Sequence, residues 1–423
     1  MKDILPKILL FLNIVFITLT LYFSSWVFYY QYEPEYYENY YYHSQWNIPN
    51  SVRGIGDGDL YKFVGYQLAN GENPFNINYE VPPLVKLLYG ITEKYTGNPY
   101  IVSILFYFLS IYVLYKFSEI IFNKNKTLTL SCILLFVTSP FIATQLKETM
   151  LDLPLTFFFL SHLYFFYKYY KTRNIKNILF SGIFLGFATG TKIGVYTPIL
   201  GLLSFLILLF TKENKRKILT LFTYTSSVFI GYILSYVSYF LKHPNPIPWV
   251  RLHQKTISFY LGTQNSHYID KLNQLKGIFL NQYQGFWLNA SRTTLGDWSP
   301  LIPIGTVLIL VAIYFSLKNK NKSLLYMALF SITILFINSI IPFYPRYLMP
   351  LIPVFCIFIV YFFQKKYSFL IFVIALLNIP FFFKSLAINK NTGTLETTIF
   401  FFEYQKLYTT LPGTTTKSKN RNT

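Results

Sequence analysis

The sequence predicts an all-α polytopic membrane protein with about eleven transmembrane helices and two large extracytoplasmic loops. Three observations predict this class. Apolar runs of about 20 residues, the length that an α-helix needs to cross a bilayer, recur along the whole chain. Hydrophobic residues make up 53% of the 423 residues, and charged residues make up only 13%, against roughly 25% in soluble proteins. The links between the apolar runs are short and rich in lysine.

The net charge of +20 does not indicate nucleic-acid binding, because the basic residues form short clusters between apolar runs and no single patch. The two cysteines, Cys132 and Cys356, each fall inside an apolar run, which argues against a disulfide framework or a metal-thiolate site. We therefore expect membrane lipids around the chain and no nucleic-acid partner.

Each apolar run is interpreted as one span. The first run is too long for a signal peptide and no small-residue cleavage site follows it, so we expect it to be retained. The region 177–211 can be one long helix broken at TGTKIG or two short helices. The predicted spans lie near residues 8–29, 99–121, 128–146, 152–170, 177–190, 193–211, 218–241, 300–317, 323–341, 347–363 and 367–386.

The lysine-rich links predict the orientation in the cell membrane. If the spans alternate, Lys2, Lys7 and every basic link fall on one side, which the positive-inside rule assigns to the cytoplasm together with the N-terminus. The membrane domain then covers residues 1–386, and the tail 387–423, expected to be partly disordered, lies outside. Loops 31–98 and 242–299 also fall outside, so we expect an extracytoplasmic functional site. The basic links are 123–126, 168–176, 212–217, 318–322 and 364–366.

Carboxylates are scarce in this chain, yet several gather in loop 31–98. Asp57 and Asp59 stand at the start of a predicted helix, and Asp152 precedes another; capping of these helices explains them as well as chemistry does. Glu80 precedes Pro82–Pro83 and a second helix of the loop. That helix is too short to span and carries apolar residues on one face, which predicts a helix lying in the outer interface.

Three isolated cations stand at the outer ends of predicted spans: Lys147, Lys192 and Arg346. A lone lysine at a helix end usually extends its ammonium to the interface without binding anything. Charges at membrane depth are costly, however, and three on one face opposite carboxylates favour a bound anion such as a lipid phosphate. The acids nearby could then accept or donate protons.

The segment DGDLYKFVGYQLANGENPF…YEVPPLVKLLYGITEKYTGN (57–98) resembles the first outer loop of the GT-C superfamily of glycosyltransferases. The similar branch is that of protein O-mannosyltransferases and lipid A aminoarabinose transferases, which has an Asp-Glu pair, a helix, a Gly and then Glu-x-Pro-Pro-Leu. Asp57 falls at the family's Asp. Gly58 replaces the family's Glu and Asp59 follows, which leaves the choice of catalytic base open between Asp57 and Asp59.

Further matches occur in the family's order. KETMLDLPLTFFFLSHLYFF resembles the second acidic turn, with Asp152 at its Asp, and SGIFLGFATGTKIGVYTPIL resembles the span that ends at a lysine, here Lys192. FYPRYLMPLIPVF resembles the late Arg-Tyr-x-x-Pro turn, with Arg346 and Tyr347. The matches cover most of the first 200 residues and one late segment, whereas loop 242–299 matches nothing in the family.

The resemblance implies a GT-C-like fold and transfer of a hexosyl or pentosyl group from a polyprenyl- or dolichyl-phosphate carrier to a hydroxyl on a lipid, glycan or protein acceptor. It implies inversion at the sugar, with the proton taken by Asp57 or Asp59. Asp152 and Glu80 would assist the base or orient the acceptor. Substrate binding would further involve Lys147, Lys192, Arg346 and Tyr347.

No cofactor is required by this interpretation. A divalent metal could be shared by Glu80 with His253 or His267, but these histidines lack tight ligand spacing. Two alternative functions are an outer-face polysaccharide polymerase or ligase and a flippase or transporter of lipid-linked sugars. Transporters keep polar sites near the membrane midplane, often in repeated halves, whereas here the polar residues cluster outside the predicted spans.

Overall fold

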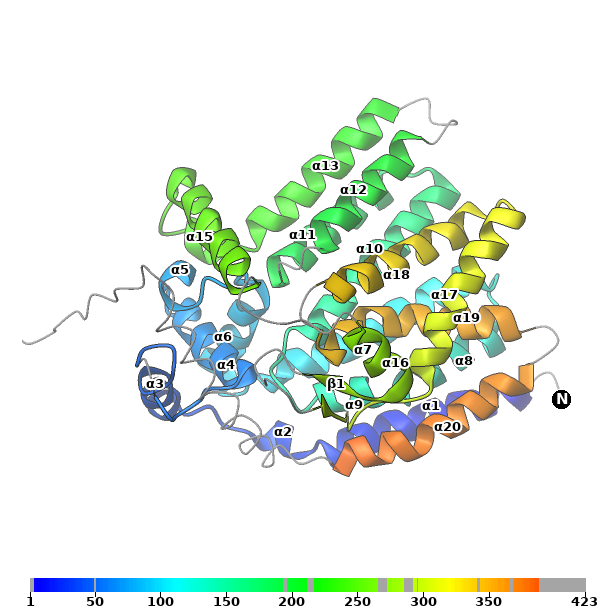
Figure 1. The fold of residues 1–423 in the computed structure, drawn as a ribbon, viewed down its shortest axis with the longest axis horizontal. Helices are drawn as coiled ribbons and strands as arrows, with labels where there is room; N and C mark the ends of the chain where they lie inside the picture. Colours follow the sequence, from blue (N-terminus) through cyan, green and yellow to red (C-terminus); the bar gives the residue numbers. More distant parts are fainter. Residues whose placement is uncertain are drawn as a thin grey trace, which may run out of the picture.

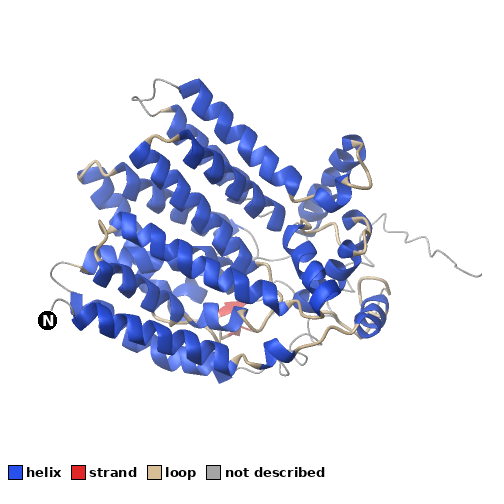
Figure 2. Ribbon diagram, turned by 180° about the vertical axis from the view of Figure 1, so that it is seen from behind, coloured by secondary structure: helices blue, strands red, loops and turns tan. Residues whose placement is uncertain are grey.

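The computed structural model describes residues 4–48, 51–192, 196–210, 217–264, 272–284, 292–294, 296–340, 343–364 and 368–387. Within these ranges the chain is a helical bundle, and the strands β1 (Tyr283–Gln284) and β2 (Arg292–Thr293) form one short antiparallel pair (Figures 1 and 2). The all-α class predicted from the sequence is thus confirmed. Of the predicted tail 387–423, only Ala387 is among the described residues.

Every predicted span contains one of the helices of the bundle. Seven of the described helical segments are long and apolar enough to cross a membrane, and three shorter apolar helices accompany them. The main helices of the bundle are α1 (Ile4–Phe23), α7 (Tyr100–Ile121), α8 (Lys126–Val137), α10 (Asp152–Thr172), α11 (Ile175–Thr191), α12 (Tyr196–Leu209), α13 (Lys217–Leu234), α17 (Leu301–Lys318), α18 (Lys322–Ile340), α19 (Ile352–Phe363) and α20 (Ser368–Ala387).

Four spans predicted as single helices are interrupted. The short helices α2 (Trp26–Tyr29) and α14 (Val237–Phe240) continue α1 and α13 after a turn. The span 128–146 breaks at Ser139, before α9 (Pro140–Gln145), because proline has no backbone N–H to continue the helical hydrogen bonds. The span 347–363 begins as the 3₁₀ helix η1 (Pro345–Leu351). The region 177–211 forms two helices, one of the two forms that the sequence allowed.

Both large loops fold into helices. The first holds α3 (Pro34–Tyr42), α4 (Asp57–Ala69), α5 (Pro74–Ile77) and α6 (Leu84–Thr96), and the second holds α15 (Pro246–Gln264) and α16 (Asn273–Leu280). Helices α3 to α6 and α15 lie together at one end of the bundle, which we call the loop end, and the N-terminus lies at the opposite end, the link end (Figure 1).

Helices α4 and α6 cross at two glycines. A Cβ atom on Gly90 would lie 1.7 Å from the carbonyl oxygen of Gly65, so the two backbones are in direct contact and only glycine fits there. Each helix is followed by a glycine with positive φ, Gly71 (+90°) after α4 and Gly97 (+73°) after α6. This crossing fixes the start of α4 relative to α6.

Helix α6 presents two different faces. Its Val85 and Tyr89 are buried against the protein, whereas the predicted apolar stripe of leucines is only half-buried and Ile91 is exposed. An apolar stripe that points away from the protein is what a helix lying in a membrane interface needs.

Candidate active site

Four charged side chains from four separate elements meet at the loop end. Arg346 in η1 donates from Nη2 to Asp57 Oδ2, at the start of α4, over 2.6 Å. Its Nε lies 3.8 Å from Asp152 Oδ2, at the start of α10. Lys192, directly after α11, donates from Nζ to the other carboxylate oxygen of Asp152 over 2.9 Å. The two carboxylates and two cations form one continuous chain of ion pairs, which we call the Asp57–Lys192 chain.

The four side chains of this chain differ in exposure to solvent. The side chain of Asp152 is 2% exposed, those of Lys192 and Arg346 are 18% and 28% exposed, and that of Asp57 is 45% exposed. The buried Asp152 therefore anchors both cations, while Asp57 faces the solvent side. Such an arrangement leaves the cations and Asp57 accessible to a substrate.

Tyr344 and Tyr347, which stand on either side of Arg346 in the sequence, lie beside the two cations. Lys192 Nζ is 4.2 Å from the centroid of the Tyr347 ring, and Arg346 Cζ is 5.4 Å from that of Tyr344. Both distances are in the range of cation–π attraction, which limits the positions that the two cations adopt.

Neither aspartate of the chain is a helix cap. The N-cap residues are Gly56 for α4 and Leu151 for α10, and Asp57 and Asp152 are the first helical residues. The capping explanation left open by the sequence therefore does not account for them, although a carboxylate in the first turn still interacts favourably with the helix dipole.

The turn before α10 is fastened to α4 and α6. Thr149 Oγ1 donates to the Gly58 carbonyl over 2.6 Å, and the Tyr89 hydroxyl donates to the Met150 carbonyl over 2.6 Å. A Cβ at Gly58 would lie 3.3 Å from Thr149 Oγ1, so the neighbour leaves little room for a side chain at this position. This tight contact gives a local reason for a glycine where the resembling family has a glutamate.

Asp59 belongs to a different cluster. Its Oδ1 lies 2.7 Å from Nζ of Lys62, whose side chain is only 3% exposed and also donates to the Tyr37 hydroxyl over 2.7 Å. Asp59 thus neutralises a buried lysine among tyrosines, while Asp57 pairs with Arg346. The structure separates the two candidates that the sequence left equivalent.

Glu80 is placed close enough to Asp57 for their charges to interact. Burial, and then the charge of Asp57, raise the pKa of Glu80 to about 8. Burial lowers the pKa of nearby Lys86 to about 7, partly offset by Glu80, and its ammonium donates to oxygen atoms of Asn78 and to the Val81 carbonyl. The raised pKa favours the protonated Glu80 carboxyl, which can donate a hydrogen bond.

Lys147 lies apart from the chain of ion pairs. Its ammonium donates to the Leu386 carbonyl near the C-terminal end of α20, where the helix dipole favours a cation. A second acidic pair beside it was missed by the sequence analysis. Burial, and then the charge of Glu148, raise the pKa of Asp297 to about 7. These two acids lie far apart in the sequence, and no motif links them.

The described residues hold no group of three or more His, Cys, Asp or Glu that could hold a metal ion. His253 uses both ring nitrogens: Nδ1 lies 2.7 Å from the Trp249 carbonyl and Nε2 lies 2.5 Å from the Tyr232 hydroxyl. His267 lies outside the described residues.

Comparison with known proteins points to one family. Residues 81–240 match the family described as dolichyl-phosphate-mannose-protein mannosyltransferase. No curated protein sequence is significantly similar to the chain.

Among solved structures, the chain is similar to ArnT from Cupriavidus metallidurans. The apo structure is 14% identical, with a TM-score of 0.50 over 84% of this chain and 73% of that chain. The structure bound to undecaprenyl phosphate is 13% identical, with a TM-score of 0.52 over 93% of this chain and 77% of that chain. At these identities the likeness shows a shared fold. Together with the family match over residues 81–240, it confirms the resemblance to this branch of the GT-C superfamily that the sequence predicted.

Proposed function

We propose that the chain is a membrane glycosyltransferase that moves a sugar from a polyprenyl-phosphate-linked donor to an acceptor hydroxyl, with inversion. The observation that carries the proposal is Arg346, which pairs with the accessible Asp57 and also lies beside the buried Asp152, itself bonded to Lys192. The family match and a fold shared with a protein solved with undecaprenyl phosphate support a lipid-phosphate donor.

The two cations suit the leaving phosphate. Lys192 and Arg346 are partly exposed and are held by Asp152 and by tyrosine rings, so they are preorganised before any substrate arrives. Fixed cations in a poorly hydrated site stabilise charge that develops on a leaving group. A lipid-linked donor brings its phosphate to this depth, because its tail stays in the bilayer.

Asp57 is the base in this proposal. A phosphate that binds Arg346 competes with Asp57 for the guanidinium and leaves the carboxylate free to accept a proton. The acceptor oxygen then bonds to the anomeric carbon as the bond from that carbon to the phosphate oxygen breaks. The proton passes to Asp57, and the electron pair leaves on the lipid phosphate beside Lys192 and Arg346.

Asp152 and Glu80 act as positioning residues. Asp152 is too buried to reach an acceptor and instead holds the two cations. The protonated Glu80 carboxyl beside Asp57 can donate a hydrogen bond that orients the acceptor, and its neutrality avoids a second negative charge next to the base. Asp59 stays with Lys62 and takes no part in transfer.

We also propose that the loop end is extracytoplasmic and that the N-terminus is cytoplasmic. The short links between α7 and α8, between α10 and α11 and between α17 and α18 are basic and lie toward the link end, whereas the site lies at the loop end (Figures 1 and 2). The positive-inside rule assigns such links to the cytoplasm.

The proposal is tested with purified protein and labelled polyprenyl-phosphate sugars, hexosyl and pentosyl, offered with lipid, glycan and peptide acceptors. We expect acceptor-dependent release of polyprenyl phosphate, lost in Asp57→Asn. Transbilayer movement of an intact lipid-linked sugar without release would identify a flippase and refute the transferase. Joining of whole glycans would identify a polymerase or ligase.

A further inference from the structure

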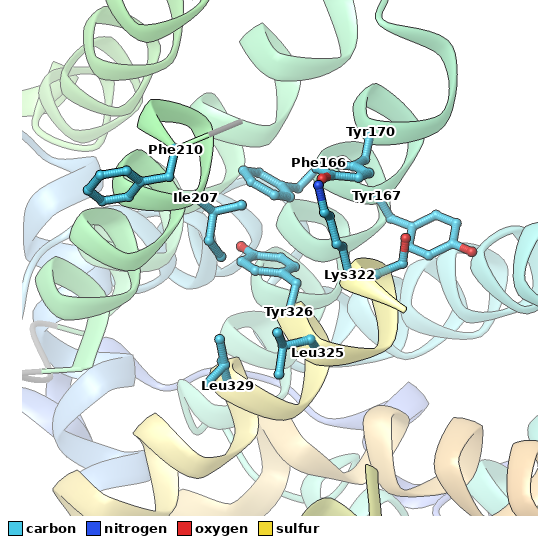
Figure 3. A pocket seen from close by; sticks show the side chains of 10 residues that line it. Phe166, Tyr167, Tyr170, Ile207, Phe210, Lys322, Leu325, Tyr326 and Leu329 are labelled. Carbon is cyan, nitrogen blue, oxygen red and sulfur yellow. The ribbon is translucent and has the colours of Figure 1, made fainter. Parts of the chain in front are cut away.

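A separate hollow lies at the link end of the bundle. It has a volume of about 250 Å³ and is lined by residues of α10 and α18 and of the end of α12, among them Phe166, Ile207, Tyr326 and Leu329 (Figure 3). Phe166 lies on the order of 20 Å along α10 from Asp152, at a rise of about 1.5 Å per residue. No residue of the Asp57–Lys192 chain lines it, so this hollow is distinct from the candidate active site.

The floor of the hollow is apolar. The ring of Tyr326 stacks on Phe166 with centroids 4.3 Å apart. Its hydroxyl is fully engaged away from the hollow, 2.8 Å from His162 Nε2 and 2.8 Å from Ser204 Oγ. Because the polar atom of Tyr326 is satisfied within the bundle, its ring presents hydrocarbon, which suits an alkyl chain better than water.

The rim of the hollow is positively charged. Lys322, the first residue of α18, is exposed and reaches toward Phe166 and Tyr170 (Figure 3). Lys171 Nζ lies 5.6 Å from the centroid of Tyr167, another residue of the lining. None of the described lining residues carries a carboxylate. The site therefore combines an apolar hollow with cations at headgroup level.

We infer that this hollow binds one acyl chain of an anionic phospholipid from the leaflet at the link end, with the phosphate at Lys322. At about 30 Å³ per water-sized group, 250 Å³ holds roughly eight methylene-sized groups, part of one acyl chain. Basic pockets between membrane helices are suited to anionic headgroups. A polyprenyl donor does not fit this assignment, because the proposed site for its phosphate is at the other end of the bundle. If the proposed orientation is correct, the leaflet at the link end is the cytoplasmic one. The rest of the inference does not depend on that orientation.

Native mass spectrometry of the full chain in detergent tests the inference with added phosphatidylglycerol, phosphatidylethanolamine or polyprenyl phosphate. We expect one retained phosphatidylglycerol per chain. Leu329→Trp fills the hollow and should abolish retention, and Lys322→Gln should weaken it about fivefold, the effect of one basic residue near an anionic headgroup. Lys318→Gln, a neutralised lysine at the same end that is not part of the lining, is the matched control and should retain the lipid.

Unchanged phosphatidylglycerol retention in a folded Leu329→Trp would overturn the inference. So would retention of phosphatidylethanolamine or polyprenyl phosphate at least as tight as that of phosphatidylglycerol. If thermal unfolding shows that Leu329→Trp is misfolded, Ile207→Trp replaces it, because this residue fills the hollow from α12. Unchanged phosphatidylglycerol retention in a folded Ile207→Trp would likewise overturn the inference. Sugar transfer at the loop end serves as an independent readout, so that loss of lipid retention with transfer intact separates this inference from the proposed function.

Discussion

At the residue scale, Asp57 and Asp59 differ in their partners although only Gly58 lies between them. A helix turns by about 100° per residue, so two residues that are two positions apart point to nearly opposite sides. Asp57 therefore meets Arg346, and Asp59 meets Lys62. The same chemical group serves as an accessible carboxylate in one place and as the counter-ion of a buried lysine in the other.

We expect Asp57→Asn to lower kcat by about a hundredfold or more, because a neutral amide cannot accept the acceptor proton. Asp59→Asn is the matched control, made on the same helix with the same loss of charge. It should leave transfer per folded molecule nearly unchanged and lower the melting temperature, since Lys62 loses its carboxylate. Measurement of kcat and thermal unfolding for both variants checks this. An active Asp57→Asn with an inactive Asp59→Asn would move the base to Asp59.

Glu80 predicts a pH dependence of stability. Its pKa is raised from the ordinary 4.5 to about 8 in the folded protein, so the folded state holds a proton that the unfolded state releases. Its stabilising contribution is complete below pH 4.5 and is lost as pH rises through 8. Between pH 5 and 7 we expect the wild-type melting temperature to fall, and Glu80→Gln to flatten this slope.

Lys86 acts in the opposite direction over a higher range. Its pKa is lowered from 10.5 to about 7, so its contribution is complete above pH 10.5 and is lost as pH falls through 7. The window from pH 5 to 7 therefore excludes most of the Lys86 titration, but Glu80 shares it with the buried acids Glu93 and Asp297, whose pKa values are also raised. A Glu80→Gln variant with the full wild-type slope in this window would show that another group titrates there.

At the element scale, the crossing of α4 and α6 sets the position of Asp57, the first residue of α4. Gly90→Ala would place a Cβ 1.7 Å from the Gly65 carbonyl and must separate the two helices. We expect a loss of about 1–3 kcal/mol of stability, as for other overpacked sites, together with a fall in transfer because α4 shifts. Melting temperature and kcat measure the two effects.

Gly201→Ala in α12 is the control for this substitution. There the added Cβ would meet only Leu185 Cδ2 at 3.5 Å, an ordinary contact. It should be tolerated, with transfer unchanged. Equal behaviour of the two alanine variants would contradict the role assigned to the α4–α6 crossing.

At the scale of the whole molecule, the proposed orientation places Tyr95 in α6 outside the cell and Lys320, between α17 and α18, inside. Both native cysteines are buried, so single cysteines introduced at these exposed positions dominate labelling by a thiol reagent that does not cross membranes. In intact cells we expect labelling of Tyr95→Cys and none of Lys320→Cys until the cells are lysed. The reverse pattern would place the candidate active site in the cytoplasm.

The places of the long apolar helices followed from the sequence, because about 20 consecutive apolar residues are required by bilayer thickness wherever the rest of the chain lies. The breaks within spans were harder to predict. Pro140 stands visibly inside one predicted span, and η1, which contains Pro350, packs against α10 and α18.

By itself the sequence determined that the chain is a membrane protein, which residues carry charge and, through the ordered motifs, which family it resembles. Only the tertiary structure decided that Arg346 pairs with Asp57, 289 positions away in the chain, and that Asp59 turns to Lys62. It also decided that the pKa of Glu80 is raised and that α10, α12 and α18 line a hollow at the link end. The physical reason is that ion pairs, burial and cavities depend on which helix faces pack together. Local sequence patterns do not specify that packing.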